Sequence, residues 1–407
     1  MKTNLTVSGR WLATGILLGW VLSSPLAADE LIAVGTLPGT SRDHSGLKDP
    51  LAKDVPHDRL GGFSAIDYTG EGQRYCVLAD RGPGDGAYPY SCRVHYLKVE
   101  LPSVLPGQLK VSLLSTSLLH DVQGRPLLGA SSAFDSSLPR SSRRFDPEGM
   151  RLGRNGELYI SDEYGPSLLR FTASGTCDKT LPLPARFLIA HPSATKNGEA
   201  VTNQSGRQPN KGMEGLAIVP SGRKLVGALQ GALIQDSVAT AKGKRTGRNV
   251  RLVEFDLQTE KIREFLYPLD ADKNGISEIL AVNDEEFIVL ERDGVGGLKA
   301  KFKKLVKVNL GHATDISKVD VLPANQLPDN IVPVQKSVLI DLLDSRHGLA
   351  GKSFPEKVEG LAFGPTLPDG RRLLIVCVDN DFLAEFSTSI YAFAIDQAHL
   401  PNYGWKH

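Results

Sequence analysis

Short apolar runs with polar residues at alternate positions recur along the chain, and Gly, Pro or Asn bounds each run. A period of two interrupted by turn residues predicts β-strands. The runs come in pairs, and the first run of each pair carries a short motif centred on a glutamate. Four copies of this motif lie at 146–150, 212–216, 276–280 and 357–361. Self-similarity of this kind predicts a repeat architecture.

The second run of each pair ends in polar groups, at 157–163, 224–230, 286–292 and 372–380. A weaker fifth pair covers 61–66 and 74–81. The glutamates lie 66, 64 and 81 residues apart (214 − 148, 278 − 214, 359 − 278), which exceeds a helical hairpin repeat. Blades of four strands with long loops fit this spacing, since propeller repeats usually take about 40 to 45 residues. In the third blade we expect strands at 215–219, 224–229, 250–257 and 261–267.

The predicted fold is therefore an all-β propeller of five or six blades. Residues 31–37 precede the first copy of the motif and are expected to close the ring as the outer strand of the last blade. No linker separates the copies, so we expect residues 29–407 to form a single domain.

The paired runs also predict a site. In an antiparallel hairpin the start of the first strand lies beside the end of the second. Carboxylates from all repeats should thus meet at one mouth of the ring, where cations or raised pKa values must relieve their repulsion. Calcium suits a flexible set of oxygen ligands. The expected metal ligands are Glu148, Asp162, Glu214, Glu278, Glu359 and Asp379.

An alternative interpretation is that each glutamate only accepts hydrogen bonds from backbone amides of the next blade, so that its repetition reflects blade construction. The endings of the second strands differ from blade to blade, which favours a built site. Two further segments, 191–211 and 235–249, are predicted to be loops. The second should rise from the carboxylate mouth, although a solvated surface is the preferred interpretation of its Lys242, Lys244 and Arg245.

Residues 1–28 have a basic start, an apolar stretch from Trp11 to Leu22 and small residues before Asp29, which predicts a secretory signal peptide too short to span a membrane. We expect a periplasmic or secreted protein without a membrane span. Without this segment the chain has 45 basic residues (47 − 2) and 46 acidic residues, which argues against general nucleic-acid binding. Of the four cysteines, Cys76 and Cys92 are the favoured disulfide pair, while Cys76 and Cys377 also suit core positions.

Motifs of other enzyme classes are absent: the sequence has no Gly-x-Ser-x-Gly, no His-Glu-x-x-His, no Walker loop and no dinucleotide fingerprint. The nine histidines show no ligand spacing. An esterase without a serine nucleophile would use metal-activated water, with a carboxylate at the mouth as the base.

The motifs at 146–150, 159–166, 211–217, 290–294, 358–362 and 378–382 together resemble a phytase-like family with esterase-like activity. The resemblance covers about residues 58 to 396 and implies an exported bacterial propeller related to calcium-dependent phosphoesterases. The third blade departs from the pattern, with Leu229 and Gln230 where other blades have acids. The positions that match are Glu148, Asp162, Glu163, Tyr164, Glu214, Glu291, Arg292, Glu359, Asp379 and Asp381.

We therefore expect a monomeric, exported, calcium-dependent enzyme that hydrolyses a small phosphate ester. The expected catalytic residues are Glu163, Glu291 and Arg292, and the expected substrate-binding residues are Arg81, Lys211, Arg248 and Tyr164. Arginine can hold two oxygens of a metal-bound phosphate at once. Two alternatives are a metal-dependent lactonase or carboxylic esterase, and a non-catalytic propeller that binds an envelope ligand.

Overall fold

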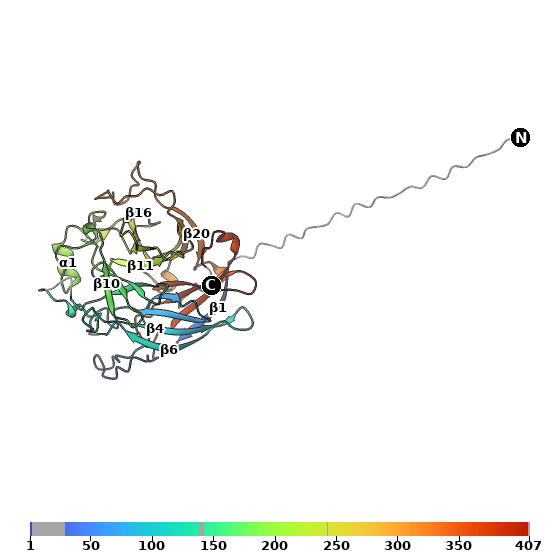
Figure 1. Cartoon of the computed structure of the whole chain (residues 1–407), viewed down its shortest axis with the longest axis horizontal. Coiled ribbons are helices and arrows are strands. Elements are labelled where there is room, and N and C mark those ends of the chain that lie inside the picture. The colour runs from blue at the N-terminus through green and yellow to red at the C-terminus, as the bar shows by residue number, and fades with distance from the viewer. Residues whose placement is uncertain (2–28, 138–141, 242, 406–407) are drawn as a thin grey trace.

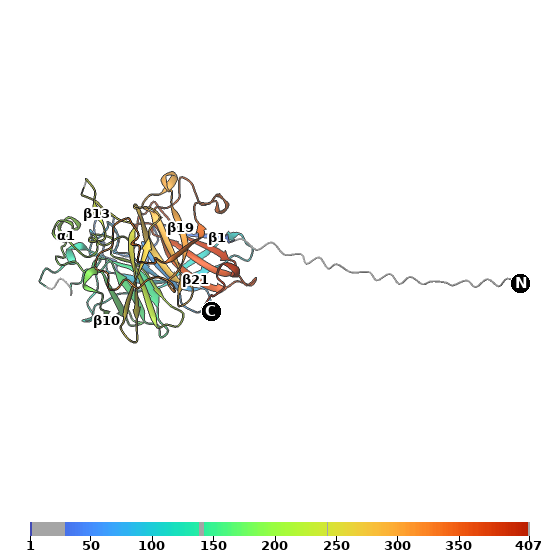
Figure 2. The same cartoon turned by 90° about the horizontal axis from the view of Figure 1, so that it is seen from above.

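Five β-sheets of four or five strands surround one axis in the computed structural model, which describes Met1 and residues 29–137, 142–241 and 243–405 (Figures 1 and 2). Each sheet is one blade, which confirms the all-β propeller and sets the number of blades at five. The predicted signal peptide lies outside the described residues. Within them, no helix is long and apolar enough to cross a membrane.

The first two blades follow the expected order of consecutive antiparallel strands. Blade one contains β2 (Phe63–Tyr68), β3 (Arg74–Ala79), β4 (Arg93–Glu100) and β6 (Lys110–Leu118). Blade two contains β7 (Pro147–Leu152), β8 (Leu158–Asp162), β9 (Ser167–Phe171) and β10 (Cys177–Leu181).

The third and fourth blades repeat this order. Blade three contains β11 (Met213–Ile218), β12 (Lys224–Leu229), β15 (Asn249–Asp256) and β16 (Ile262–Pro268). Blade four contains β17 (Asn274–Ala281), β18 (Glu286–Asp293), β19 (Lys303–Asn309) and β20 (Gln335–Asp341). The strands of blade three lie within two residues of the boundaries that the sequence predicts.

The last blade joins the two ends of the described chain. It contains β21 (Val358–Thr366), β22 (Arg372–Val378), β23 (Thr388–Ile395) and β1 (Glu30–Leu37), with β5 (Gly107–Gln108) on the edge. β1 runs antiparallel to β23, with Val34 opposite Tyr391. The predicted closure of the ring by the first strand is confirmed.

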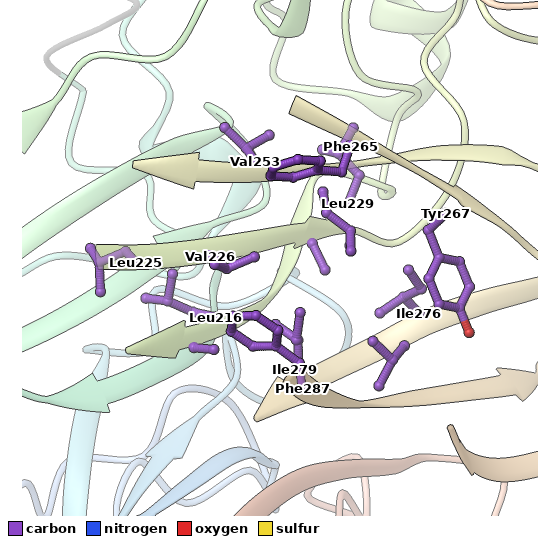
Figure 3. Close-up of a cluster of buried hydrophobic side chains, with 14 of the residues drawn as sticks. Leu216, Leu225, Val226, Leu229, Val253, Phe265, Tyr267, Ile276, Ile279 and Phe287 are labelled. Carbon is purple, nitrogen blue, oxygen red and sulfur yellow. The ribbon is translucent and has the colours of Figure 1, made fainter. Parts of the chain in front are cut away.

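Glycine after the motif glutamate lets neighbouring innermost strands approach each other. A Cβ atom on Gly149 would lie 2.6 Å from the backbone nitrogen of Leu216, and one on Gly215 would lie 2.8 Å from Cα of Glu278. Apolar side chains fill the space between blades, as Leu216, Ile279 and Phe287 do between blades three and four (Figure 3). The repeated Glu-Gly therefore serves blade packing as well as the site.

Two predicted loops contain regular structure. Helix α1 (Lys196–Thr202) lies within 191–211 and begins after Thr195, whose side chain accepts a hydrogen bond from the Gly198 amide. The segment 235–249 forms a short hairpin of β13 (Val238–Ala239) and β14 (Arg245–Thr246), and Lys242 lies outside the described residues. The 3₁₀ turns span Ser131–Ala133, Ala185–Phe187, Gly297–Lys299, Ser345–His347 and Gln397–His399.

The favoured disulfide is wrong, because all four cysteines are free and buried. Leu78 of β3 pairs with Val94 of β4, so Cys92 lies level with residue 80, four residues from Cys76. At about 3.3 Å per residue this separation is roughly 13 Å, whereas a disulfide requires Cα atoms within about 7 Å.

Candidate functional site

A β-bulge near the start of every innermost strand turns one side chain toward the mouth of the ring. The register of each inner pair shifts by one residue at this point. An extra residue in a strand redirects its side chain, so the bulges define equivalent positions in the five blades. The residues at these positions are Ser64, Glu148, Glu214, Ser277 and Glu359.

Glu148 lies at the centre of a buried cluster of carboxylates. It belongs to one group with Asp80 and Asp146 and to another with Glu163 and Glu214, and in each group one oxygen per residue lies within 4.8 Å of the others. The Ser64 hydroxyl donates to Glu148 Oε2 at 2.7 Å. The structure thus brings Glu148, Glu163 and Glu214 together, as the hairpin geometry predicts, and adds two aspartates.

Burial leaves oxygens of this cluster without partners. Neither Oδ1 of Asp146 nor Oε2 of Glu214 has a hydrogen-bond partner among the described residues, although Gln230 donates to Oε1 of Glu214 at 2.6 Å. Burial raises the pKa of Asp146, Glu148 and Glu214 well above the usual range, and neighbouring carboxylates raise it further. Buried carboxylate oxygens that lack donors and repel one another fit a hard cation with oxygen ligands.

Basic residues surround the cluster. Arg81 forms ion pairs with Asp146, with Asp85 at 2.8 Å and with Glu163 at 3.6 Å. On the opposite side of the mouth, the Arg292 guanidinium donates to the hydroxyl of Ser277 at 2.7 Å and to Glu359 at 2.8 Å.

Glu359 is another buried acid whose pKa is raised. Its pKa is raised to about 7, chiefly by burial and also by Asp379, while Lys357 and Arg292 oppose the rise. The Lys357 ammonium lies 2.9 Å from Asp379 and 3.8 Å from Asp80. Lys357 therefore connects the acids of blade five to those of blade one.

Glu278 lies below the mouth and not in the cluster. The bulge of β17 places Ser277 at the mouth, so Glu278 takes the position that glycine occupies in blades two, three and five. Its Oε1 accepts hydrogen bonds from the amides of Leu216 and Ile279, and its Oε2 lies 3.0 Å from Arg151. This geometry matches the alternative interpretation, in which a repeated glutamate accepts backbone hydrogen bonds and stabilises the packing of neighbouring blades.

Glu291 also lies away from the cluster. Its carboxylate accepts hydrogen bonds from Tyr267 and Asn274, each at 2.7 Å, and from Lys336 at 3.0 Å. Successive side chains of a strand point to opposite faces, so Glu291 and Arg292 cannot both face the mouth. Both residues lie at the end of β18, as the hairpin geometry predicts, but strand alternation points their side chains to opposite faces.

Asp162 holds the turn after β8. Its oxygens accept hydrogen bonds from the amides of Asp146 (3.0 Å), Tyr164 (3.2 Å) and Gly165 (2.9 Å) and from the Ser167 hydroxyl (3.1 Å). These donors occupy the carboxylate, and Asp162 is in neither group around Glu148.

The expected substrate-binding residues have different surroundings. Arg248 donates to the carbonyl of Leu269 at 2.7 Å and fixes the base of the loop. Tyr164 stacks against Arg144, with the guanidinium carbon 4.2 Å from the ring centroid. Burial lowers the pKa of Lys211, which is close enough to Glu163 and Glu214 for both to oppose this shift. Of the expected set, Arg81 and Lys211 lie beside the cluster.

Asp80, Asp146 and Lys357 were not among the predicted site residues. Asp80 ends the second run of the weakest repeat, and Asp146 and Lys357 each lie two residues before a motif glutamate. The charged residue at each of these positions was the sequence feature from which these three site residues could have been predicted.

The comparisons with known proteins agree with this architecture. A family model described as phytase-like, esterase-like activity of phytase, matches residues 58–382. The chain belongs to this family. A protein of Arthroderma benhamiae described as an uncharacterized secreted protein is 25% identical over an alignment of 362 residues, and the match covers 71% of this chain and 67% of the relative.

Solved structures resemble the chain only distantly. An ancestral GH74 enzyme has a TM-score of 0.35 and 12% identity over 80% of this chain, and the match spans 35% of that enzyme. Virginiamycin B lyase from Staphylococcus aureus has a TM-score of 0.31 and 9% identity, with 82% of this chain and 95% of the lyase covered. Neither likeness bears on what this chain binds or does.

Proposed function

We propose that the protein is an exported, calcium-dependent phosphoesterase whose site is the mouth of the propeller. The observation that supports this proposal most is the pair of carboxylate groups that share Glu148, with buried oxygens of Asp146 and Glu214 that lack donors. Burying such oxygens destabilises the folded protein unless a cation or a proton binds to them. The secreted relative and the phytase-like family support export and ester chemistry.

The metal-holding residues in this proposal are Asp80, Asp146, Glu148, Glu163 and Glu214. Glu163, which the sequence predicts as a catalytic residue, is placed in this set because it lies in one group with Glu148 and Glu214. Calcium, when bound, supplies polarisation of an ester oxygen and of a water molecule. Asp162, Glu278 and Glu291 are left out of the set because they belong to neither carboxylate group. Protein donors bind Asp162 and Glu291, and Glu278 has amide donors on Oε1 and the Arg151 guanidinium 3.0 Å from Oε2.

The remaining charged groups at the mouth serve to position the substrate and to transfer protons. Glu359 has a pKa of about 7, which suits a group that takes a proton and returns it near neutral pH. Arg292 binds Glu359 through one nitrogen and Ser277 through another, which orients its guanidinium toward the same space. Arg81 and Lys211 provide positive charge for a phosphate on the other side.

The direct test measures calcium binding to the purified chain from residue 29 onward by isothermal titration calorimetry. Hydrolysis of p-nitrophenyl phosphate and p-nitrophenyl acetate is then followed with and without a chelator. We expect phosphate-ester hydrolysis to require calcium. The variant Glu148→Gln keeps the size of the side chain and should weaken calcium binding at least tenfold, with activity restored at high calcium.

Glu291→Gln is the matched control, because Glu291 is an equally buried glutamate outside the cluster. This substitution should lower the thermal stability, because it weakens the hydrogen bonds from Tyr267 and Asn274. It should leave calcium affinity unchanged. Hydrolysis that persists in excess chelator, or parental calcium affinity in Glu148→Gln, would refute the proposal.

A carboxylic esterase or lactonase is the second candidate, and one observation favours it. Arg81, Arg292 and Lys357 are all engaged by carboxylates, which leaves less positive charge for a phosphate. Faster calcium-dependent turnover of p-nitrophenyl acetate than of p-nitrophenyl phosphate would support this candidate. Calcium binding without turnover of any ester would support a binding propeller.

A further inference from the structure

A cleft of about 770 Å³ opens beside the mouth of the propeller. Its size lies within the roughly 300 to 1,000 Å³ that is typical of small-molecule pockets. Lys357 and Asp379 are among the residues that line it. Its lining combines the apolar side chains of Leu349, Phe354, Leu383, Phe386 and Tyr391 with charged residues that include Lys352, Glu356 and Glu385.

Lys357 joins this cleft to the carboxylate cluster. Its ammonium lies 2.9 Å from Asp379, which lines the cleft, and 3.8 Å from Asp80, which belongs to the cluster. A second hollow of about 300 Å³ contains Asp80 and shares Asp381 and Leu383 with the cleft. A molecule that reacts at the mouth can therefore extend over Lys357 to the apolar side chains of the cleft.

The outer wall is a loop that the protein holds in an unusual conformation. Asp381 and Phe382 have φ values of 52° and 56°, a region that non-glycine residues adopt at an energetic cost. Asn380 holds this shape, since its Oδ1 accepts from the amides of Gly62 (3.0 Å) and Phe382 (3.2 Å) and its Nδ2 donates to the carbonyl of Phe386 (2.9 Å).

The same loop buries one aromatic ring and exposes two other apolar side chains. Phe382 packs edge-on against Tyr90, with ring centroids 5.1 Å apart. Leu383 and Phe386 remain 41% and 58% exposed at the cleft. Apolar side chains that a fixed loop holds beside a charged site gain free energy when an apolar group covers them.

Resting on the proposed function, we propose that this cleft binds the apolar alkyl or aryl group of the ester substrate. The preferred substrate is then a phosphate ester of an apolar alcohol, not a polyol with many phosphates. Charge supports this choice, because the acids of the site outnumber its bases. The acids are Asp80, Asp146, Glu148, Glu163, Glu214, Glu359 and Asp379, and the bases are Arg81, Lys211, Arg292 and Lys357.

The test compares 1-naphthyl phosphate with glycerol 2-phosphate as substrates at saturating calcium. The parent should have the higher kcat/KM for 1-naphthyl phosphate. Phe386→Ala and Leu383→Ala should each raise its KM roughly tenfold, the effect of losing about 50 Å² of apolar contact, and leave the KM for glycerol 2-phosphate unchanged. Leu327→Ala is the matched control, because Leu327 is 49% exposed and lies outside the cleft.

Binding of 1-naphthol, followed by its fluorescence, separates this inference from the proposed function. Binding that weakens in Phe386→Ala would support an apolar subsite even if the parent hydrolyses no phosphate ester, in which case only the proposed function fails. If the parent hydrolyses both esters equally well and Phe386→Ala changes neither KM, the apolar subsite is wrong while the phosphoesterase stands. Failure of 1-naphthol to bind the parent would also overturn the subsite.

Discussion

Replacing Arg151 by methionine should destabilise the propeller, and the loss should grow with pH. Arg151 is buried in the centre of the ring, where its guanidinium donates to the carbonyls of Ile66 (3.1 Å), Met150 (2.7 Å) and Ile279 (2.8 Å). It also lies 3.0 Å from the Glu278 carboxylate. The side chain thus spans from β7 to β2 and β17 and holds three blades together.

The loss of stability depends on the groups that remain buried without Arg151, which are the Glu278 carboxyl and the three backbone carbonyls. At pH 8 the Glu278 carboxyl must either stay ionised without a counter-charge or take up a proton, and breaking a buried pair in this way typically costs about 3 to 5 kcal/mol. At pH 5 the same carboxyl is protonated in the folded protein, because its pKa is raised to about 7, chiefly by burial. The loss then reduces to the missing hydrogen bonds, about 1 to 3 kcal/mol.

The sign of the pH dependence is fixed by the direction of this shift. A carboxyl with a pKa of about 7 in the folded protein and about 4.3 when unfolded stabilises the fold below pH 4.3, and this contribution is lost as pH rises through 7. Arg151 lowers the pKa of Glu278. Its removal raises that pKa further, so the variant should lose stability over a wider range above neutral pH.

Urea unfolding, followed by circular dichroism in the presence of chelator, measures the loss in free energy of unfolding at pH 5 and at pH 8. Arg154→Met is the control, because Arg154 lies in the exposed turn of the same hairpin and donates to the carbonyl of Pro220 at 2.8 Å. It should change the free energy of unfolding by less than about 0.5 kcal/mol. An equal loss at both pH values in Arg151→Met, or a loss below about 1 kcal/mol at pH 8, would refute the reasoning.

Further predictions concern the mouth and the inner ring. Glu278→Gln should leave calcium affinity unchanged in calorimetry, and a tenfold loss would return Glu278 to the ligand set. Arg292→Lys keeps the charge but loses the fork that holds Ser277 and Glu359, so turnover should fall roughly ten- to a thousandfold in steady-state assays; parental turnover would contradict a catalytic role. Without metal, the free energy of unfolding should fall between about pH 5 and pH 8, because Glu359, with a pKa of about 7, must ionise while buried; urea titrations that give a flat profile would contradict this. Gly149→Ala should cost about 1 to 3 kcal/mol, since its Cβ would lie 2.6 Å from a backbone nitrogen, whereas Gly294→Ala, with open space around it, should not.

Much of the fold could be read from the sequence because strand signals are local. Period-two runs and turn residues located the strands of blade three within two residues, and the repeated motif identified the innermost strand of each blade. The position of residues 31–37 before the first repeat was enough to predict the pairing of β1 with β23. The pairing of Cys76 with Cys92 failed because closeness along the chain does not give the register of two strands.

The sequence by itself determined a propeller with glutamates at the start of its innermost strands, because period, turns and repeats are written along the chain. Tertiary structure decided which acids meet. A bulge in β17 presents Ser277 at the mouth and sends Glu278 to Arg151, and the alternation of β18 separates Glu291 from Arg292. A shift of one residue in a strand reverses the face of a side chain, and only the packed ring fixes that shift.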